Sequence, residues 1–223
     1  MKKQRRGQLM KEKLLEEACI VFAEKGYRDA THMDICQRAD ANVASINYYF
    51  GTKENLYQAV FACLIEKAEL QFPLDGGLPP TAAPEKKLQA FIHAQLGRMY
   101  DPEQGGLHQI RMSEVFDSTG LLTEALEDQL AQSRAVIIHI LEELLGPQVS
   151  QQDIVWCEMS IVGQCFVGGP SQEDNGPRNL FGLHKSNVEQ LTDHILTFSL
   201  AGVKAIRKRV EHTIRSRESG HEL

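Results

Sequence analysis

The chain has 223 residues, of which 42% are hydrophobic and 24% are charged, so its composition is that of an ordinary globular protein. No apolar run reaches the roughly 18 to 20 residues that a membrane span needs, and the charges that follow the basic N-terminus exclude a secretory signal peptide. We therefore expect a cytoplasmic protein that makes no contact with a membrane.

Charge is distributed very unevenly along the chain. Residues 1–53 hold ten Lys or Arg and seven Asp or Glu, residues 54–203 hold eight and twenty, and residues 204–223 hold six and three. The net charge of −6 therefore averages a basic head, a strongly acidic body and a basic tail. This segregation indicates that only the head meets a polyanion such as nucleic acid, because the body would be repelled by it.

The sequence carries no pattern that indicates catalysis, a cofactor or a metal. Its five cysteines are scattered in apolar helical patterns without a C-x-x-C pair, which favours reduced core thiols. His32 and Cys36 lie four residues apart, but two ligands do not make a metal site. Neither a Ser-His-Asp or Cys-His motif nor a Gly-rich phosphate loop is present.

The first 13 residues are strongly basic, with six Lys or Arg against the single acid Glu12. Such a segment is either a solvated, disordered terminus or an arm that contacts phosphates or the minor groove of DNA, and both interpretations stay open. Apolar residues that recur every three or four positions predict an amphipathic helix over Leu14–Lys25. Gly26 is well suited to end it.

Two short helices joined by a tight turn are predicted next, over Thr31–Ala39 and about Asn42–Tyr49. Thr31 is a good N-cap with Asp34 as its capping-box partner, and Asp40 begins the turn. The second helix has too few apolar residues for a core helix and presents small, hydrogen-bonding side chains, as insertion into the major groove requires. Its outward residues are Ala44, Ser45, Asn47 and Tyr48, its inward anchors are Ile46 and Phe50, and the inward residues of the preceding helix are Met33, Ile35 and Cys36.

The remainder of the chain contains no alternating segment typical of a β-strand, so the predicted fold class is all-α. Apolar periodicity predicts helices over Leu56–Phe72, Glu85–Tyr100, Leu107–Asp117, Thr123–Leu145, Ile154–Val167 and Asn187–Gly202. The basic tail through Arg217 can extend the last of them. Exposed loops are expected at 73–84 and 168–185, where Pro, Gly and polar residues interrupt the periodicity.

The pattern from Leu14 to Leu56 resembles the N-terminal domain of TetR-type transcriptional regulators. The matching features are Lys-Gly-Tyr at 25–27, the Thr-capped helix, Ala39 before the turn, Tyr48-Tyr49-Phe50 and Lys53-Glu54-Asn55-Leu56. The chain departs from the family pattern with Asp40 where Gly is usual in the turn and Asn42 where Ser is usual as cap. Asp and Asn both tolerate turn and left-handed conformations, so we expect the fold to accept both.

The resemblance implies a division of labour along the chain. Residues 1–56 would form the N-terminal arm and a three-helix DNA-binding domain. Residues 57–223 would form a helical regulatory and dimerisation domain that contains the two predicted loops. Such a protein acts on double-stranded DNA and would associate with the bacterial nucleoid when bound.

The resemblance also implies DNA-binding roles for particular residues. Thr31 and Lys53 would lie at helix N-termini, which favour a phosphate, and Arg28 would lie near another phosphate. Tyr48 would hydrogen-bond the DNA backbone or a base edge, whereas Tyr49 stays open between core, rim and phosphate contact. The full set is Arg5, Arg6, Arg28, Thr31, Asn42, Ala44, Ser45, Asn47, Tyr48, Tyr49 and Lys53.

The helix Ile154–Val167 is apolar on almost every face, which is typical of an interface or of a helix central to a monomer. We predict that it packs with Asn187–Gly202 and that both pair with the same helices of a second copy. Two heads about 34 to 36 Å apart would then read an inverted repeat. The candidate interface residues are Trp156, Ser160, Gly163, Val188, Leu191, Ile195 and Phe198.

TetR-type bodies bind a small molecule among their helices, and the body of this chain resembles one subgroup through Arg111 and Glu114 and through Val-Gly-Gln at 162–164. The spacing of Arg111 and Glu114 suits a structural ion pair or the polar groups of a mostly apolar pocket, and both interpretations stay open. The candidate pocket residues are Met99, Tyr100, His108, Arg111, Met112, Glu114, Phe116 and Trp156.

The leading hypothesis is a ligand-responsive, dimeric repressor that binds a palindromic operator and is released by a small molecule. One alternative is a DNA-binding regulator without a ligand. Another is an all-α enzyme that carries a helix-turn-helix as an interaction module, which would need a reactive constellation that the body does not show.

Overall fold

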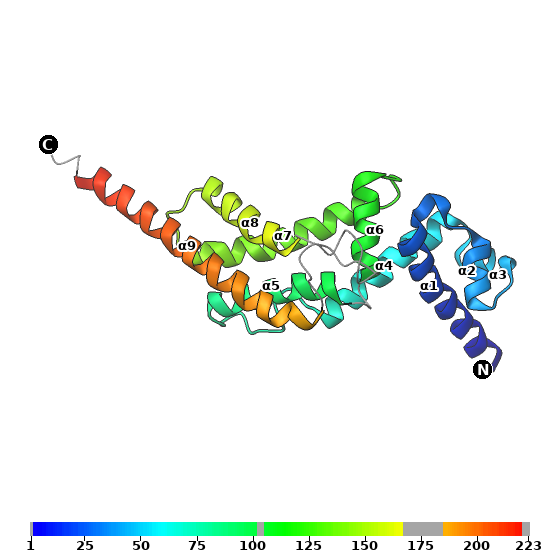
Figure 1. Ribbon diagram of the computed structural model, residues 1–223. Coiled ribbons are helices and arrows are strands. Elements are labelled where there is room, and N and C mark those ends of the chain that lie inside the picture. Colours follow the sequence, from blue (N-terminus) through cyan, green and yellow to red (C-terminus); the bar gives the residue numbers. More distant parts are fainter. Residues whose placement is uncertain (1, 102–104, 167–184, 220–223) are drawn as a thin grey trace. The chain divides into compact units, whose positions relative to one another are not determined.

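The computed structural model describes residues 2–101, 105–166 and 185–219, and within these ranges the chain forms helices and no strand (Figure 1). The all-α prediction is therefore confirmed. The helices are α1 (Lys2–Asp29), α2 (His32–Ala39), α3 (Val43–Phe50), α4 (Lys53–Gln71), α5 (Pro84–Tyr100), α6 (Gly105–Phe116), α7 (Thr123–Leu145), α8 (Gln151–Cys165), the 3-10 turn η1 (Lys185–Asn187) and α9 (Val188–Ser219).

The two basic ends of the chain are more helical than the sequence pattern alone indicated. Residues 2–13 are neither a disordered terminus nor a separate arm, because α1 starts at Lys2 and runs through to a kink at Gly26, where φ is 73° and ψ is 173°. Positive φ combined with ψ near 180° is adopted readily by glycine alone. At the other end α9 continues through the basic tail to Ser219, as the sequence allowed. The predicted loop 168–185 lies outside the described residues except for Lys185.

The chain divides into two compact units. Unit 1 comprises residues 1–71 and 101–128, and unit 2 comprises residues 72–100 and 129–223, with the undescribed residues in both set aside. Helices α4 and α6 thus pack with α1–α3 in unit 1, whereas the sequence placed a functional boundary between residues 56 and 57. Packing and function need not divide a chain at the same residue, and the functional boundary stays a prediction.

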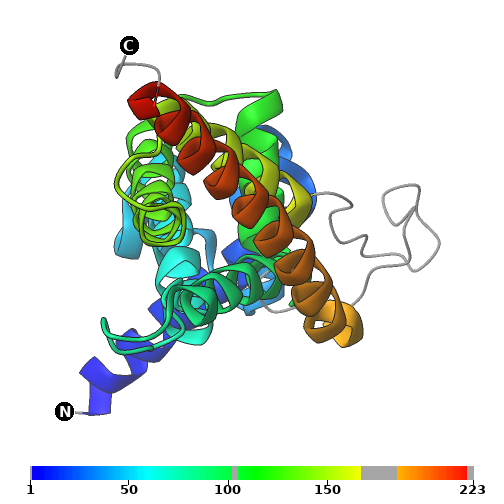
Figure 2. The same cartoon turned by 90° about the vertical axis from the view of Figure 1, so that its left-hand side faces the viewer.

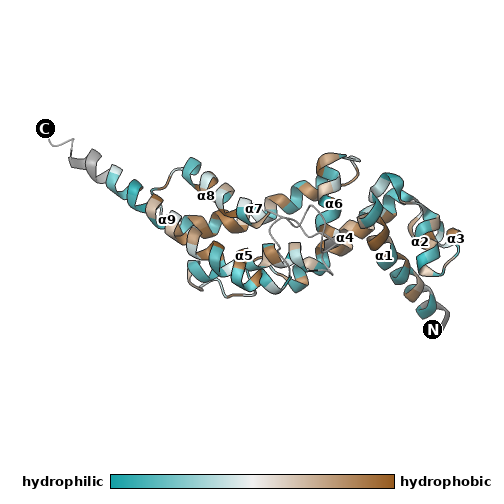
Figure 3. Cartoon of the chain, in the orientation of Figure 1, coloured by the Kyte–Doolittle hydropathy of each residue, from teal (hydrophilic) through white to brown (hydrophobic). Residues whose placement is uncertain are grey.

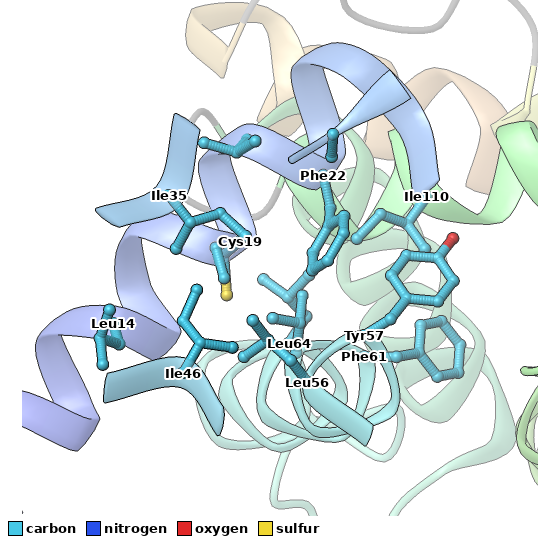
Figure 4. Packing of buried hydrophobic residues seen from close by; sticks show 14 of the residues in the cluster. Leu14, Cys19, Phe22, Ile35, Ile46, Leu56, Tyr57, Phe61, Leu64 and Ile110 are labelled. Atoms are coloured by element: carbon cyan, nitrogen blue, oxygen red, sulfur yellow. The ribbon is translucent and has the colours of Figure 1, made fainter. Parts of the chain in front are cut away.

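The core of unit 1 draws one apolar side from each of its helices (Figure 4). Leu14 of α1, Ile35 of α2 and Ile46 of α3 are completely buried. The rings of Phe22 and Tyr57 meet edge to face with 4.9 Å between their centroids, an arrangement that aromatic pairs prefer. Because Ile46 is the one fully buried residue of α3, it holds this helix against the core and leaves the opposite side free.

The core of unit 2 is built from α5, α7, α8 and α9. Helix α9 packs on both α5 and α8 and runs obliquely past them in Figure 2. In Figure 3 the colour of α9 changes to hydrophilic toward the C-terminus, where the basic tail begins. Gly97 of α5 is needed for packing, because a Cβ there would lie 2.4 Å from the ring of Phe72. Burial of apolar side chains at about 25 cal/mol per Å² is the main stabilising term for both cores.

The described part of the chain has neither a membrane-spanning helix nor a metal-binding cluster. No helix there is both long and apolar enough to cross a membrane. No group of three or more His, Cys, Asp or Glu there is arranged to hold a metal ion. The five cysteines are free thiols, four of them buried, as expected for core residues.

Candidate nucleic-acid interface

Helix α2 begins with the predicted capping box. The Thr31 hydroxyl accepts a hydrogen bond from the Asp34 amide at 3.1 Å, and the Asp34 carboxylate accepts one from the Thr31 amide at 3.0 Å. Lys25 donates to the same carboxylate at 2.7 Å. The Lys25 ammonium and then the Thr31 donors lower the pKa of Asp34 to about 2. The start of α2 is thus tied both to its own cap and to the end of α1.

The turn between α2 and α3 explains both departures from the family pattern. Asp40 has φ 51° and ψ 49°, and within the described residues it is the only non-glycine residue with positive φ. Its amide and that of Ala41 close the end of α2 on the Cys36 carbonyl. Asn42 then caps α3, because its side-chain oxygen accepts from the Ala44 amide at 2.9 Å. Asp and Asn replace Gly and Ser at little cost, as expected.

One face of α3 is open to solvent. Ala44 and Asn47 are exposed, and Tyr48 is 81% exposed, as predicted for residues that meet a groove. Ser45, also predicted to point outward, is only half-buried. Val43 is 41% exposed on the same face, and the sequence interpretation overlooked it because an apolar residue at a helix start is usually assigned to the core.

Tyr49 lies between core and surface. Its ring is half-buried against the core of unit 1 and meets the ring of Tyr48 edge to face at 4.9 Å. A Cβ on Gly7 of α1 would come within 3.4 Å of the Tyr49 hydroxyl, so the basic start of α1 lies beside the end of α3. Arg5 and Arg6 are exposed on this part of α1. They therefore belong to a helix whose start lies beside Tyr49 at the end of α3, and not to a flexible arm.

Met33 is an incorrect prediction. It was expected to face inward from α2, but it is 70% exposed. The inward residues are Ile35, Cys36 and Ala39. Successive residues of a helix are about 100° apart, so Met33 lies on the side opposite Ile35.

Lys53 and Arg28 occupy the positions predicted for phosphate contacts, but each already has partners. The Lys53 ammonium donates to the Arg28 carbonyl at 3.3 Å and lies 4.5 Å from the centre of the Tyr27 ring. Burial lowers the pKa of Lys53. The Arg28 guanidinium donates to Asp117 at 2.9 Å, and this pair raises the pKa of Arg28. Both side chains of the pair are more than 60% exposed, so DNA can compete for Arg28.

The predicted ligand-pocket residues fall in both units. Met99 and Tyr100 are buried in unit 2, which also holds Trp156, and the remaining candidates belong to unit 1. Phe116 is 85% exposed, which corrects its assignment to an apolar pocket, because at 100° per residue it lies on the side of α6 opposite the buried Leu107. A side chain this exposed does not line a concave pocket that buries its ligand.

Glu114 has a structural role in unit 1. Its buried carboxylate accepts from the Tyr57 hydroxyl at 2.9 Å and from the amide and hydroxyl of Thr119 at 2.9 and 2.8 Å. Burial and the Glu114 carboxylate raise the pKa of Tyr57, so its hydroxyl stays a donor. The carboxylate therefore fastens the segment after α6 to α4, because a buried charge must be hydrogen-bonded.

Two surface hollows are present elsewhere. One, of about 290 Å³, lies in unit 1 between α4 and the start of α7 and includes Phe61, Ile65 and Leu121. The other, of about 160 Å³, lies in unit 2 between α8 and α9. None of the eight predicted pocket residues lines either hollow.

The seven predicted interface residues on α8 and α9 differ in exposure. Trp156 and Phe198 are 57% and 66% exposed, and Ser160 and Gly163 are exposed beside them. An added Cβ on Gly163 would meet nothing within 4 Å. Leu191 is half-buried, whereas Val188 and Ile195 are buried within their own chain, which corrects their assignment. The packing of α9 on α5 takes up their side of the helix.

Comparisons with known proteins match this chain in two blocks. The family "Bacterial regulatory proteins, tetR family" matches residues 14–60. The family "HTH-type transcriptional dual regulator CecR, C-terminal domain" matches residues 84–203, which is more than half of the chain.

Curated relatives are similar over part of their length. The HTH-type transcriptional regulator SrpR of Pseudomonas putida is 23% identical over 144 residues, which cover 65% of this chain and 63% of SrpR. The IcaR negative regulator of the biofilm operon in Staphylococcus aureus is 33% identical over 57 residues, 26% of this chain and 31% of IcaR. The chain therefore spans less than two thirds of either relative.

Solved structures share the fold. A Clostridium perfringens chain superposes with a TM-score of 0.64 at 22% identity, with 85% of this chain and 97% of that chain covered. AibR, solved in complex with isovaleryl coenzyme A and operator DNA, superposes with a TM-score of 0.58 at 18% identity, with 85% and 97% covered. At such identities the likeness concerns the fold alone.

Proposed function

The chain belongs to the TetR family of transcriptional regulators and carries a C-terminal domain of the CecR type, and on this premise we propose that it is a dimeric repressor that binds an inverted-repeat operator and is released by a small molecule. Membership of this family makes the chain a DNA-binding regulator and not an enzyme. The operator, the dimer and the effector belong to the proposal, as does action in the cytoplasm.

The open face of α3 is the observation that carries the proposal. Ala44, Asn47 and Tyr48 project from a helix that is capped at its start and fixed from behind by Ile46. The Thr31 end of α2 and the Lys53 end of α4 offer helix N-termini for phosphates on either side. A short helix of this kind fits the major groove, which is about 12 Å wide. Arg5, Arg6, Arg28, Asn42, Ser45 and Tyr49 complete the proposed DNA-binding set.

The exposed side of α8 and α9 supports the dimer. It gathers Trp156, Met159 and Phe198, each more than half exposed, around Gly163 and Gly202, where an added Cβ would meet nothing. A monomer rarely leaves large apolar side chains together in water. Pairing of these helices with those of a second copy by two-fold symmetry would cover them. It would also present two copies of α3 to the two halves of an inverted repeat.

The effector is the least constrained part of the proposal. Its candidate residues are Met99 and Tyr100 within unit 2 and, separately, His108, Arg111 and Met112 within unit 1. AibR shares the fold and was solved with isovaleryl coenzyme A and operator DNA, so an acyl coenzyme A is a reasonable first probe. For release, the effector must bind the DNA-free conformation more tightly than the DNA-bound one.

The test starts from the full chain and a pool of random-sequence DNA duplexes. We expect selection to enrich an inverted repeat, binding to weaken steeply with salt, and the free protein to have twice the chain mass of 25.0 kDa. Failure to enrich any sequence would overturn the operator, and a mass of 25.0 kDa with and without DNA would overturn the dimer.

The effector is tested separately on the selected duplex. Isovaleryl coenzyme A and a panel of longer acyl coenzymes A are added to the complex, with free coenzyme A as the control. Release by an acyl form but not by coenzyme A supports the proposal. Unchanged binding with the entire panel, together with the absence of release by a chemically diverse compound library, would favour the regulator without a ligand.

A further inference from the structure

We propose that α3 reads A·T base pairs at the centre of each operator half-site, through the methyl groups of thymine and the amide-binding edge of adenine. This inference rests on the proposed function, because it assumes that α3 enters the major groove. It adds the chemistry of the bases that α3 selects, and it assigns a role to Val43.

Helix α3 offers no charged side chain. Its sequence is VASINYYF, and its exposed residues are Val43, Ala44, Asn47 and Tyr48. With steps of about 100° per residue these four lie within about 140° of one another. They therefore form a single face, while Ile46 anchors the opposite side. We call Val43, Ala44, Asn47 and Tyr48 the reading face.

Half of the reading face is aliphatic. Val43 is 41% exposed in the first turn, and Ala44 is exposed next to it. Of the four bases only thymine presents a methyl group in the major groove, and small aliphatic side chains are its usual partners. Val43 and Ala44 would bury thymine methyl groups, whereas beside a G·C pair they would cover polar atoms without bonding them.

Asn47 provides the complementary hydrogen bonds. Within the described residues its carboxamide has no partner, whereas the side-chain oxygen of Asn42 is already used by the Ala44 amide. A free carboxamide can accept from N6 and donate to N7 of adenine, which is the pairing that asparagine favours. The Tyr48 hydroxyl adds one group that can donate or accept and that does not by itself choose between base pairs.

The cations that could otherwise bond guanine are held elsewhere. Bidentate contacts to guanine O6 and N7 come mainly from arginine and lysine. Arg38, at the end of α2, is bound to Glu17 at 3.0 Å and to Glu24 at 3.6 Å. Lys25 is bound to Asp34 at 2.7 Å.

Lys53 lies over the Tyr27 ring, and Arg28, for which DNA can compete with Asp117, belongs to α1 and not to the reading face, so it suits a phosphate. Arg5 and Arg6 belong to α1 and not to the reading face. Their exposed guanidinium groups suit phosphates or the minor groove, where arginine is attracted to narrow A·T-rich segments. The charges around α3 thus position the protein, and the uncharged reading face selects the bases.

The experiment modifies the bases of a duplex selected from random sequence by the full chain. Each thymine of a half-site is replaced in turn by deoxyuridine, which removes only the methyl group, and each adenine by 7-deazaadenine, which removes N7. We expect at least one deoxyuridine to lower affinity about fourfold, the effect of one buried methyl-sized group, and at least one 7-deazaadenine to lower it about tenfold.

Three variants connect these effects to the reading face. Val43→Ala should reduce the sensitivity to deoxyuridine at the thymine that Val43 covers and leave the contact of Ala44, and Asn47→Ala should lose the sensitivity to 7-deazaadenine. Val115→Ala is the matched control, because Val115 is 68% exposed on α6 and should retain both sensitivities.

Several outcomes overturn the inference. Enriched half-sites with central G·C pairs whose guanine N7 methylation blocks binding would do so, as would deoxyuridine duplexes that all bind with full affinity. Sensitivities of unchanged size in both Val43→Ala and Asn47→Ala would exclude the reading face as their source. If no sequence is enriched at all, the proposed function fails first and the inference fails with it.

Discussion

Two exposed surfaces of this protein, the reading face of α3 and the apolar side of α8 and α9, differ in what they offer a partner. Each exposes aromatic side chains, with Tyr48 81% exposed on α3 and Phe198 66% exposed on α9. The reading face mixes aliphatic groups with a free carboxamide and a hydroxyl. The α8–α9 side gathers Trp156, Met159 and Phe198 around glycines.

The difference shows how one chain separates selection from association. Hydrogen-bonding groups on a narrow helix suit the edges of bases, where a mismatched pair leaves polar atoms unbonded. Large apolar side chains beside small ones suit a second protein surface. Removal of apolar area from water stabilises such a contact, and a particular arrangement of hydrogen bonds is not needed. We therefore expect damage to the first surface to change which DNA is bound, and damage to the second to remove the dimer.

The largest effect is expected from Phe198→Asp. A carboxylate in an apolar interface is costly to bury, so the variant should have the mass of one chain, 25.0 kDa, in analytical ultracentrifugation. Its affinity for the full inverted repeat should fall roughly a hundredfold or more, because each half-site then binds on its own. Leu130→Asp on α7 is the matched control, since Leu130 is 61% exposed and should leave the dimer intact. A Phe198→Asp protein that stays dimeric would contradict the assignment of this surface.

Tyr48→Ala tests the other surface. It should lower operator affinity about 10- to 100-fold, since it removes a hydroxyl that can donate to DNA and a ring that excludes water. The mass should remain that of the dimer, and titration calorimetry or a gel-shift series would give the affinities. Tyr48→Phe retains the ring and isolates the hydroxyl contribution. Operator affinity equal to that of the unchanged protein in both variants would exclude Tyr48 from the contact.

Tyr57→Phe removes a buried hydrogen bond and leaves both exposed surfaces unchanged. It should therefore change stability without changing DNA selection or the dimer. The Tyr57 hydroxyl donates to the buried Glu114 carboxylate at 2.9 Å. Its loss should lower the free energy of unfolding by about 1.5 to 3 kcal/mol, as for hydrogen bonds to charged groups. Urea denaturation measures the change.

The matched control for Tyr57 is Tyr27→Phe. The Tyr27 hydroxyl also donates to a carboxylate, that of Glu54, at 2.9 Å, but the bond is exposed to solvent. The expected loss of stability is below about 1 kcal/mol, because water replaces the lost partner. Equal losses for the two variants would show that burial of the Glu114 carboxylate does not strengthen its bond to Tyr57.

The smallest effect is expected at the capping box of α2, which Thr31 and Asp34 form. The pKa of Asp34 is about 2 in the folded protein against 3.8 without its partners. A depressed pKa means that the contribution to stability is complete above about pH 4 and is lost as pH falls toward 2. Asp34→Asn should remove this dependence, so the difference in stability between the two proteins should shrink from pH 5 to pH 2. A constant difference, followed by circular dichroism, would contradict the assignment of the shift to Asp34.

Local patterns in the sequence suffice for the elements and for their ends. Apolar periodicity predicts α1 from Leu14 onward and α4 to α9, whereas α2 and α3 follow from Thr31 and Asn42, which are identified as caps because a cap depends only on residues within one turn of it. Resemblance to the TetR family then places Asn47 and Tyr48 on the side of α3 that faces the groove. Both are exposed in the structure.

Contacts between distant parts of the chain required the tertiary structure. Arg28 is paired with Asp117, 89 residues away, and Glu114 accepts a hydrogen bond from Tyr57, 57 residues away, whereas the spacing of Arg111 and Glu114 left the role of Glu114 open. Periodicity shows that a helix has an apolar side but not which neighbour covers it. For that reason Val188 and Ile195 were assigned to an interface, whereas they are buried in their own chain.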